Sequence, residues 1–395
     1  MGRRVFVTGY GLLSSIGDDA ESTLSSLLAG QSGIGQVKNV KTLLDRYPFG
    51  ETSLTAKELM VKAGLDFASF YSRPFLLGLN AAQEAIRMAG VEEHLPTMGF
   101  VSSTTAAGMD LVEYCYGKLC EGDSSLAPLV DTMDCSDACN RIATMLGIRN
   151  FVTNISTACA SSTNAIILGA RLIRAGMVDR MLVGGMDSLV RFSINGFNAL
   201  EIISPTGCHP FDNNRDGVTV AEGAAFLVLE AEEVVGERRV YGEIKGYANA
   251  NSAFHQTASS PNGEGALKVM QASLRSAGLQ PSEIDYINAH GTGTRNNDIS
   301  EGRAMVACFG EILPPFSSTK GYTGHALAAA GAIEAIISLF TINNGVIFPN
   351  LRFETPMEEL PITPVTALTK KEVRYVMSNS FGFGGADASL IISKV

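Results

Sequence analysis

Apolar residues along this chain alternate between two patterns. Short continuous apolar runs, which are typical of buried strands, recur at Met98–Val101, Arg180–Gly185 and Ala225–Glu230. Between such runs, apolar residues recur at i, i+3 and i+4, which predicts helices over Leu76–Ala89 and Ile166–Ala175. Because strands and helices alternate along the whole chain, we predict an α/β fold.

Two distant segments also resemble each other. Val5–Ser15 aligns with Tyr241–Asn251, each being a glycine-punctuated strand pattern. Chance similarity of two such strands is the alternative. The charged stretch Glu230–Arg239 lies just before the second copy and is a natural boundary. We therefore predict two similar halves, residues 1–236 and 237–395.

Composition narrows the class of protein. The 395 residues are 46% hydrophobic and 18% charged, which is enough apolar material for a large core. A net charge of −10 without a basic tract argues against a nucleic-acid partner. The seven cysteines form no Cys-x-x-Cys pair, so we expect reduced thiols and neither a structural metal site nor a disulfide framework. We find no apolar leader or membrane-length run, so we expect a soluble cytoplasmic protein without a membrane partner.

Cys159 is the first candidate for chemistry. It lies between an apolar strand-like run, Phe151–Ile155, and a helical pattern that begins near Ser162. Unpaired backbone N–H groups at a helix N-terminus favour negative charge, so we expect this position to lower the pKa of the thiol. The alternative is a buried structural cysteine.

Two histidines and a lysine occur at similar junctions. His290 follows an apolar strand-like run, and His325 follows a Ser/Thr/Gly loop and precedes an Ala-rich helix predicted over Ala326–Phe340. A helix N-terminus disfavours imidazolium, so we expect a neutral His325 that donates one N–H. Lys320 lies five residues before it, and the Gly-rich turn Asn379–Gly385 could direct a backbone N–H at an oxyanion. The alternatives are structural histidines, a solvated lysine and a simple hairpin.

The cysteine, the His-Gly-Thr-Gly-Thr segment at His290, the Lys-x-x-x-Gly-His segment ending at His325 and the Asn-Ser-Phe-Gly-Phe-Gly-Gly turn occur in this order. Together they resemble the β-ketoacyl-acyl-carrier-protein synthases, the elongating condensing enzymes with a Cys-His-His site. The resemblance covers essentially the whole chain. It implies a thiolase-like, five-layered αβαβα fold built from two similar halves. It also implies decarboxylative condensation of a Cys159-bound acyl group with malonyl-acyl carrier protein, in fatty-acid or polyene/polyketide elongation, without a cofactor.

The resemblance also implies residue roles. Cys159 corresponds to the nucleophile, His290 and His325 to the pair that promotes malonyl decarboxylation, and Lys320 to their supporting lysine. The backbone N–H groups of Phe383 and Cys159 would form the oxyanion hole, and in relatives the Phe383 ring gates the acyl pocket. A monovalent-cation site or polar network is implied for four further residues: Asn288, Glu301, Glu334 and Ser378.

The chain departs from the family pattern at several points. Ala386-Asp387 follows the Gly-rich turn where relatives have Thr-Asn or His-Asn, and Ala221-Glu222-Gly223 replaces Gly-Glu-Gly. Ser102–Met109 replaces the Gly-rich stretch that lines the acyl pocket, and Arg295–Asp298 is more similar to polyketide synthases. The acyl length and the pathway therefore stay open.

The resemblance implies acyl carrier protein as partner and a homodimer, or alternatively a heterodimer with a Cys-less paralogue. A thiolase-like or cysteine-dependent thioester hydrolase is a second candidate, but the second histidine and Lys320 argue against it. A chain-length-determining subunit is a third, and such subunits lack the nucleophile that Cys159 provides.

Overall fold

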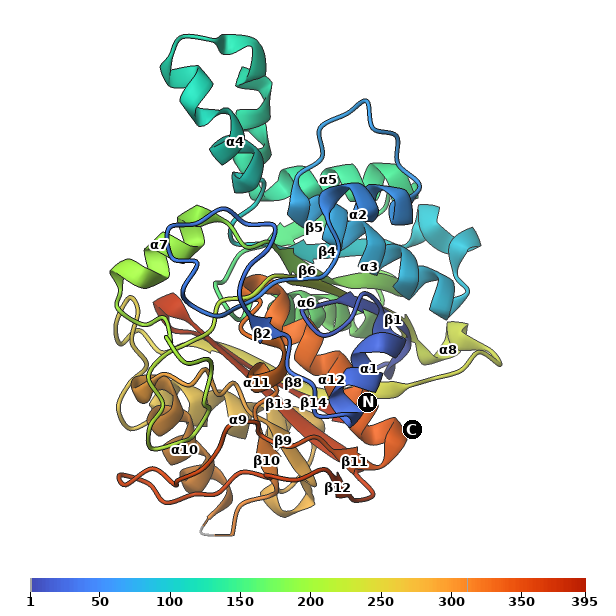
Figure 1. Cartoon of the computed structure of the whole chain (residues 1–395). Coiled ribbons are helices and arrows are strands. Elements are labelled where there is room, and N and C mark those ends of the chain that lie inside the picture. The colour runs from blue at the N-terminus through green and yellow to red at the C-terminus, as the bar shows by residue number, and fades with distance from the viewer. Residues whose placement is uncertain (1, 311) are drawn as a thin grey trace.

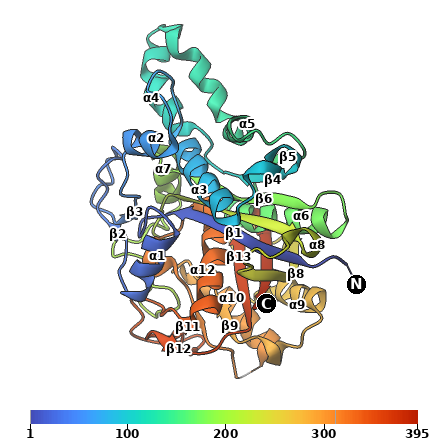
Figure 2. The ribbon, with the colours of Figure 1, turned by 90° about the vertical axis from the view of Figure 1, so that its right-hand side faces the viewer.

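The computed structural model describes residues 2–310 and 312–395, and ten strands form its main sheet (Figures 1 and 2). These strands are β1 (Val5–Leu13), β4 (Gly99–Ser103), β5 (Val152–Ile155), β6 (Arg180–Asp187), β7 (Gly223–Ala231), β8 (Gly242–Asn251), β9 (Tyr286–Asn288), β10 (Phe316–Ser317), β13 (Tyr375–Gly382) and β14 (Ala386–Ser393). Four short strands form two separate pairs: β2 (Ile34–Gly35) with β3 (Phe49–Gly50), and β11 (Val346–Ile347) with β12 (Thr369–Lys370).

The ten-stranded sheet repeats one topology twice. Its order is β10-β9-β13-β14-β8 followed by β1-β7-β6-β4-β5. Counted inward from its outer edge, each set of five contains its third, second, fourth, fifth and first strand in chain order. The two sets meet where Phe6 and Val7 of β1 pair with Glu243 and Gly242 of β8. These are the two segments that resemble each other in sequence. The repeated order supports a division of the chain near residue 236, which stays a prediction.

Helices cover both five-stranded sets, each of which forms one layer, and fill the space between them. α3 (Arg73–Ala89) packs on β1 and β7, α9 (Glu264–Ala277) packs on β8 and β14, and α10 (Arg295–Phe309) packs on α9. α6 (Ser161–Arg174) and α12 (Ala330–Asn344) contact each other and strands of both sets. Helix, sheet, helix, sheet and helix therefore follow one another as five layers (Figure 2).

The remaining helices are shorter or peripheral. They are α1 (Ala20–Leu28), α2 (Ala56–Ala63), α4 (Met109–Cys120), α5 (Cys135–Leu146), α7 (Arg191–Ala199), α8 (Glu232–Val235), α11 (Lys320–Thr323) and the 3₁₀ segments η1 (Glu92–Thr97), η2 (Ser124–Met133), η3 (Pro281–Glu283), η4 (Leu327–Ala329) and η5 (Phe383–Gly385).

The central helix α12 is mostly apolar and almost entirely buried. The stretch Leu327–Asn344 is long and apolar enough to cross a membrane, but 89% of it is buried inside the protein. A mostly apolar helix enclosed between the two sets of strands belongs to the core. The helix predicted over Ala326–Phe340 begins later, at Ala330, because Leu327 has a φ of +49° and the chain first makes the 3₁₀ turn η4.

One segment stands clear of the layers. α4 and η2 form an arm that projects from the body (Figure 1). The base of the arm is closed where Gly108 N–H donates to Thr132 O at 2.8 Å. Aromatic side chains on α4 face solvent, with Tyr114 59% and Tyr116 65% exposed. An apolar surface on such a projection is typical of a contact with another chain.

Candidate active site

Cys159 lies in a tight turn immediately before α6. Ala158 has a φ of +49°, and Ala160 is the N-cap of the helix. Ser161 Oγ donates to Ala158 O at 2.6 Å and accepts from Thr157 N–H at 2.8 Å, which fixes the turn. The strand-to-helix junction predicted from the sequence is therefore present, and Cys159 is 7% exposed.

The ionisation of Cys159 differs from the prediction. Burial raises the pKa of the thiol to about 11, although the Lys320 ammonium and the backbone N–H of Phe383 act to lower it. The prediction that the helix N-terminus lowers this pKa is thus wrong, because the loss of water outweighs the local dipoles. The resting group is a thiol, and it must give up its proton as it reacts.

The Gly-rich turn meets Cys159 from the opposite side. It is the hairpin between β13 and β14, and the backbone N–H of Phe383 faces the Cys159 sulfur, where it acts to lower the pKa of the thiol. Gly382 lies so close that a Cβ there would be 3.0 Å from Thr157 O and 3.1 Å from Cys159 N. The amides of Cys159 and Phe383 therefore both lie beside the sulfur, where they could donate to the carbonyl oxygen of a thioester formed on it.

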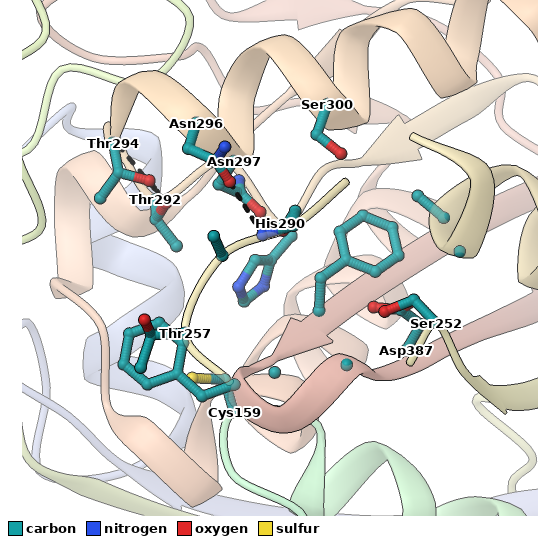
Figure 3. A pocket seen from close by; sticks show the side chains of 18 of the residues that line it. Cys159, Ser252, Thr257, His290, Thr292, Thr294, Asn296, Asn297, Ser300 and Asp387 are labelled. Carbon is teal, nitrogen blue, oxygen red and sulfur yellow. Dashed lines mark hydrogen bonds between the residues drawn. The ribbon is translucent and has the colours of Figure 1, made fainter. Parts of the chain in front are cut away.

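His290 and His325 complete the same pocket. His290 follows β9, and His325 follows α11. The backbone N–H of His325 donates to Thr219 O at 2.7 Å. The two rings are 5.5 Å apart and perpendicular, and both line a pocket with Cys159. Figure 3 shows His290 above Cys159 in this pocket.

Both histidines are neutral. Burial and the nearby Lys320 ammonium hold the pKa of His290 and of His325 well below the ordinary value. The expectation of a neutral His325 is confirmed, although burial is the largest cause. Neither ring nitrogen of His325 has a hydrogen-bond partner among the described residues. Its ring N–H is therefore free to bind a substrate oxygen.

Lys320 is a buried part of the site and not a solvated lysine, since it is 1% exposed. Its Nζ donates to His290 O at 2.6 Å, lies 3.3 Å from His290 Nδ1 and forms an ion pair with Glu334. An ammonium group can only donate, so Nδ1 of His290 accepts and the ring proton lies on Nε2. Lys320 thereby fixes the tautomer that points an N–H into the pocket.

The four residues implied for a cation site or polar network lie around this pair. The Glu301 carboxylate accepts from the N–H groups of His290 and Gly291, both at 2.8 Å. Asn288 Nδ2 donates to Glu334 O at 3.3 Å, and Ser378 pairs with Asn288 in the sheet register. Burial raises the pKa of Glu301 and of Glu334 to about 7.

Sequence reasoning missed several residues that the fold brings to this site. Phe197 of α7 stacks on Phe383, with ring centroids 5.8 Å apart, and nothing in its local sequence indicates that contact. Asn379 donates to Glu301 at 3.3 Å, and its position in the Gly-rich turn was a usable signal. Thr163 of α6 and Ser380 of β13 hydrogen bond at 2.8 Å and join the helix that carries the cysteine to the hairpin.

Hydroxyl and amide groups line much of the pocket beyond the catalytic residues. Asp387, one of the departures from the family pattern, is among the lining residues, near Ser252 (Figure 3). Burial raises the pKa of Asp387 to about 7, and a hydrogen bond from Ser252 acts to lower it. The pocket has a volume of about 850 Å³, part of which is open to solvent.

Comparisons with known proteins identify the family. The model of the β-ketoacyl synthase N-terminal domain matches residues 2–234, and that of the C-terminal domain matches residues 241–354. The chain is 34% identical to the 3-oxoacyl-[acyl-carrier-protein] synthase 2 of Staphylococcus aureus, over 99% of this chain and 98% of that protein. It is 31% identical to the Vibrio cholerae enzyme of the same name, over 100% and 99% of the two chains.

Solved structures show the same architecture. The ishigamide ketosynthase/chain length factor superposes with a TM-score of 0.93 at 30% identity, covering 100% of both chains. The ketosynthase ApeO, in complex with its chain length factor ApeC from Xenorhabdus doucetiae, gives a TM-score of 0.86 at 31% identity, covering 100% of this chain and 98% of that one. The predicted thiolase-like α/β fold is thereby confirmed. With both domain models matched and the Cys-His-His geometry in place, the chain belongs to the β-ketoacyl synthase family.

Proposed function

We propose that this protein is a 3-oxoacyl-[acyl-carrier-protein] synthase that extends an acyl chain held on Cys159 by two carbons from malonyl-acyl carrier protein. The observation that carries the proposal is one pocket in which two neutral histidines face a cysteine flanked by two backbone amides. The family membership and the synthase relatives support the reaction class, in fatty-acid or polyketide elongation.

The first half-reaction loads the enzyme. The Cys159 sulfur attacks the carbonyl carbon of an acyl-carrier-protein thioester, and the N–H groups of Cys159 and Phe383 stabilise the oxyanion. The carbon–sulfur bond to the carrier arm then breaks. The proton that leaves Cys159 ends on the departing carrier thiol, so the acyl-enzyme forms without a net change in charge.

The second half-reaction releases CO2 and forms the new bond. When the bond from the malonyl α-carbon to its carboxylate breaks, the electron pair forms an enolate at the thioester. His290, through Nε2–H, and His325 donate hydrogen bonds to the enolate oxygen. The α-carbon then attacks the carbonyl of the Cys159 thioester, and the sulfur leaves as a thiolate, which takes up a proton from water. The product is β-ketoacyl-carrier protein.

Three buried oxygens support a monovalent cation behind the histidines. Asn288 Oδ1, Glu334 Oε2 and Asn379 Oδ1 have no hydrogen-bond donor among the described residues. Carboxylate and amide oxygens suit a hard cation. These residues fit such an ion, and Glu301 and Ser378 lie next to Asn379 and Asn288 in the same polar network.

Separate assays of the half-reactions test the proposal. Incubation with an acyl-carrier protein should give one adduct by intact mass, mapped to Cys159 and absent in Cys159→Ala. His290→Ala and His325→Ala should lose CO2 release from malonyl-carrier protein and retain measurable acylation. An adduct on another cysteine contradicts the nucleophile assignment. Equal loss of both half-reactions in folded histidine variants would make the histidines bases for the thiol instead. Hydrolysis of the acyl-enzyme without CO2 release would favour the thioester hydrolase.

We also propose acyl carrier protein as the substrate carrier and a second synthase-fold chain as the partner at the arm. Ketosynthase neighbours are solved with a carrier protein and with a chain length factor. The exposed aromatics of the arm support a contact there, and we favour a homodimer, with a Cys-less paralogue as the alternative.

Light scattering on the protein expressed alone should show an active dimer. Tyr114→Ser/Tyr116→Ser should weaken the dimer, whereas Leu43→Ser, at a 99% exposed residue, should not. An inactive lone chain rescued by a co-expressed paralogue would establish the heterodimer.

A further inference from the structure

A buried carboxylate outside the machinery described so far connects two parts of the site. Asp187 ends β6, is fully buried, and has no ion-pair partner among residues 2–310 and 312–395. A buried carboxylate without a cation costs free energy unless hydrogen bonds replace the water it loses. Packing alone does not require such a group at this position, so its contacts indicate its role.

One set of contacts holds the segment that follows β4. Thr104 Oγ1 donates to Asp187 Oδ1 at 2.7 Å, and Ala106 N–H donates to the same oxygen at 3.0 Å. Thr105 donates through its hydroxyl to Oδ2 at 2.6 Å, and its N–H lies 3.0 and 3.1 Å from the two oxygens. This segment lies within Ser102–Met109 and leads through Gly108 into the base of the arm.

The other contact holds the turn that follows His325. Ala328 N–H, in η4, donates to Asp187 Oδ2 at 2.9 Å. His325 itself is tied to Thr219 and Ala221 through its backbone, so Asp187 fixes the chain on its other side. The junction also abuts α6, because a Cβ at Gly185 would lie 3.0 Å from both Ala328 O and Ser162 Cβ.

We infer that Asp187 is a positioning residue for the condensation, which holds the segment Thr104–Ala106 and the turn after His325 in one fixed arrangement. The inference rests on the proposed function. It assigns to one carboxylate the alignment of a decarboxylating histidine with the segment that corresponds to the acyl-pocket wall. Thr104–Ala106 continues into the arm. A partner chain bound at the arm would therefore act through Asp187 on both this segment and the turn after His325.

The chemistry of the carboxylate makes a sharp test possible. Both oxygens accept backbone N–H groups, so the amide of Asp187→Asn must turn its NH2 against an N–H donor in either orientation. The contacts that hold Thr104–Ala106 and the turn after His325 at residue 187 are therefore weakened, although the side chain keeps its size. We expect CO2 release from malonyl-carrier protein to fall about 10- to 100-fold, as for small misplacements of catalytic groups. The negative charge near Cys159 also disappears, and alkylation of Cys159 by iodoacetamide should become faster.

Slower CO2 release together with faster alkylation of Cys159 distinguishes a positioning role from loss of the fold. Asp212→Asn is the matched control, because Asp212 is also buried and accepts backbone N–H groups of Glu354 and Thr355 away from this junction. It should leave the ratio of CO2 release to Cys159 alkylation unchanged. If Asp187→Asn does not fold, Thr104→Val/Thr105→Val removes the two hydroxyl donors of the segment Thr104–Ala106 and leaves the contact with Ala328 in place. That variant should retain CO2 release and shift the chain length of the products.

The results that overturn the inference are equally specific. A parallel fall of CO2 release and alkylation in Asp187→Asn, or no change in either, contradicts it. So does an unchanged product length in the threonine double variant. If the unmodified protein releases no CO2 from malonyl-carrier protein, the proposed function fails, whereas failure confined to the variants rejects the role of Asp187.

Discussion

Lys320→Met should destabilise the protein strongly at pH 8 and much less at pH 5.5. The methionine fills most of the space of the lysine stem but removes the ammonium that pairs with Glu334. A buried carboxylate then remains without its ion-pair partner. Breaking one partner of a buried ion pair costs about 3–5 kcal/mol.

That cost translates into a measurable shift in melting temperature. A chain of 395 residues has an unfolding entropy of roughly 0.8 kcal/mol per kelvin, at about 2 cal/mol per kelvin per residue. The variant should therefore melt about 4–6 °C below the unmodified protein at pH 8.

The pH dependence follows from the raised pKa of Glu334, which is about 7 in the folded protein against an ordinary 4.5. The folded state binds more protons than the unfolded state between these values, so this group stabilises the fold as the pH falls from above 7 toward 4.5. Without the ammonium the folded pKa rises further, and the variant gains more from acidification than the unmodified protein does.

Scanning calorimetry at pH 8 and pH 5.5 on Lys320→Met, Glu334→Gln and the double variant tests this reasoning. Glu334→Gln should restore part of the melting temperature of Lys320→Met at pH 8, because it removes the unpaired charge. If the double variant melts no higher than Lys320→Met at pH 8, or if the deficit is the same at both pH values, then the unpaired carboxylate is not the cause.

Two further predictions concern Cys159. Its alkylation by iodoacetamide should rise about tenfold per pH unit up to about pH 11, because burial raises the thiol pKa to that value; a plateau near pH 7 would refute the buried-thiol assignment. Gly382→Ala places a Cβ 3.1 Å from Cys159 N and should lower kcat about 100-fold or more by disturbing the oxyanion hole, with a smaller change in KM; an unchanged kcat would show that the hole lies elsewhere.

Much of the fold and the site could be predicted from local sequence, because the relevant signals are local. The strand-to-helix junction at Cys159 was visible as an apolar run followed by small residues, and the two strands that resemble each other proved topologically equivalent. Helix α3 begins three residues before the predicted Leu76, because Ser72 as N-cap and Pro74 in the first turn start it earlier.

What could not be predicted depends on burial and on distant contacts. The pKa of Cys159 follows from how many atoms surround the sulfur, which no local pattern records. The same holds for Asp187, whose donors come from two segments more than 80 and 140 residues away in the chain. Phe197 reaches Phe383 only because the tertiary fold brings α7 over the hairpin.

The repeated strand order has a consequence for the origin of the chemistry. Cys159 follows β5, the third strand in chain order of the N-terminal set, and His325 follows β10, the third strand in chain order of the C-terminal set. Two identical copies of such a unit, assembled as separate chains, would carry the same residue at both places. Such an assembly would carry either two nucleophiles or two proton donors, and never one of each. Joining the copies in a single polypeptide lets each place change independently, so the asymmetric reaction depends on covalent linkage of two structurally symmetric parts.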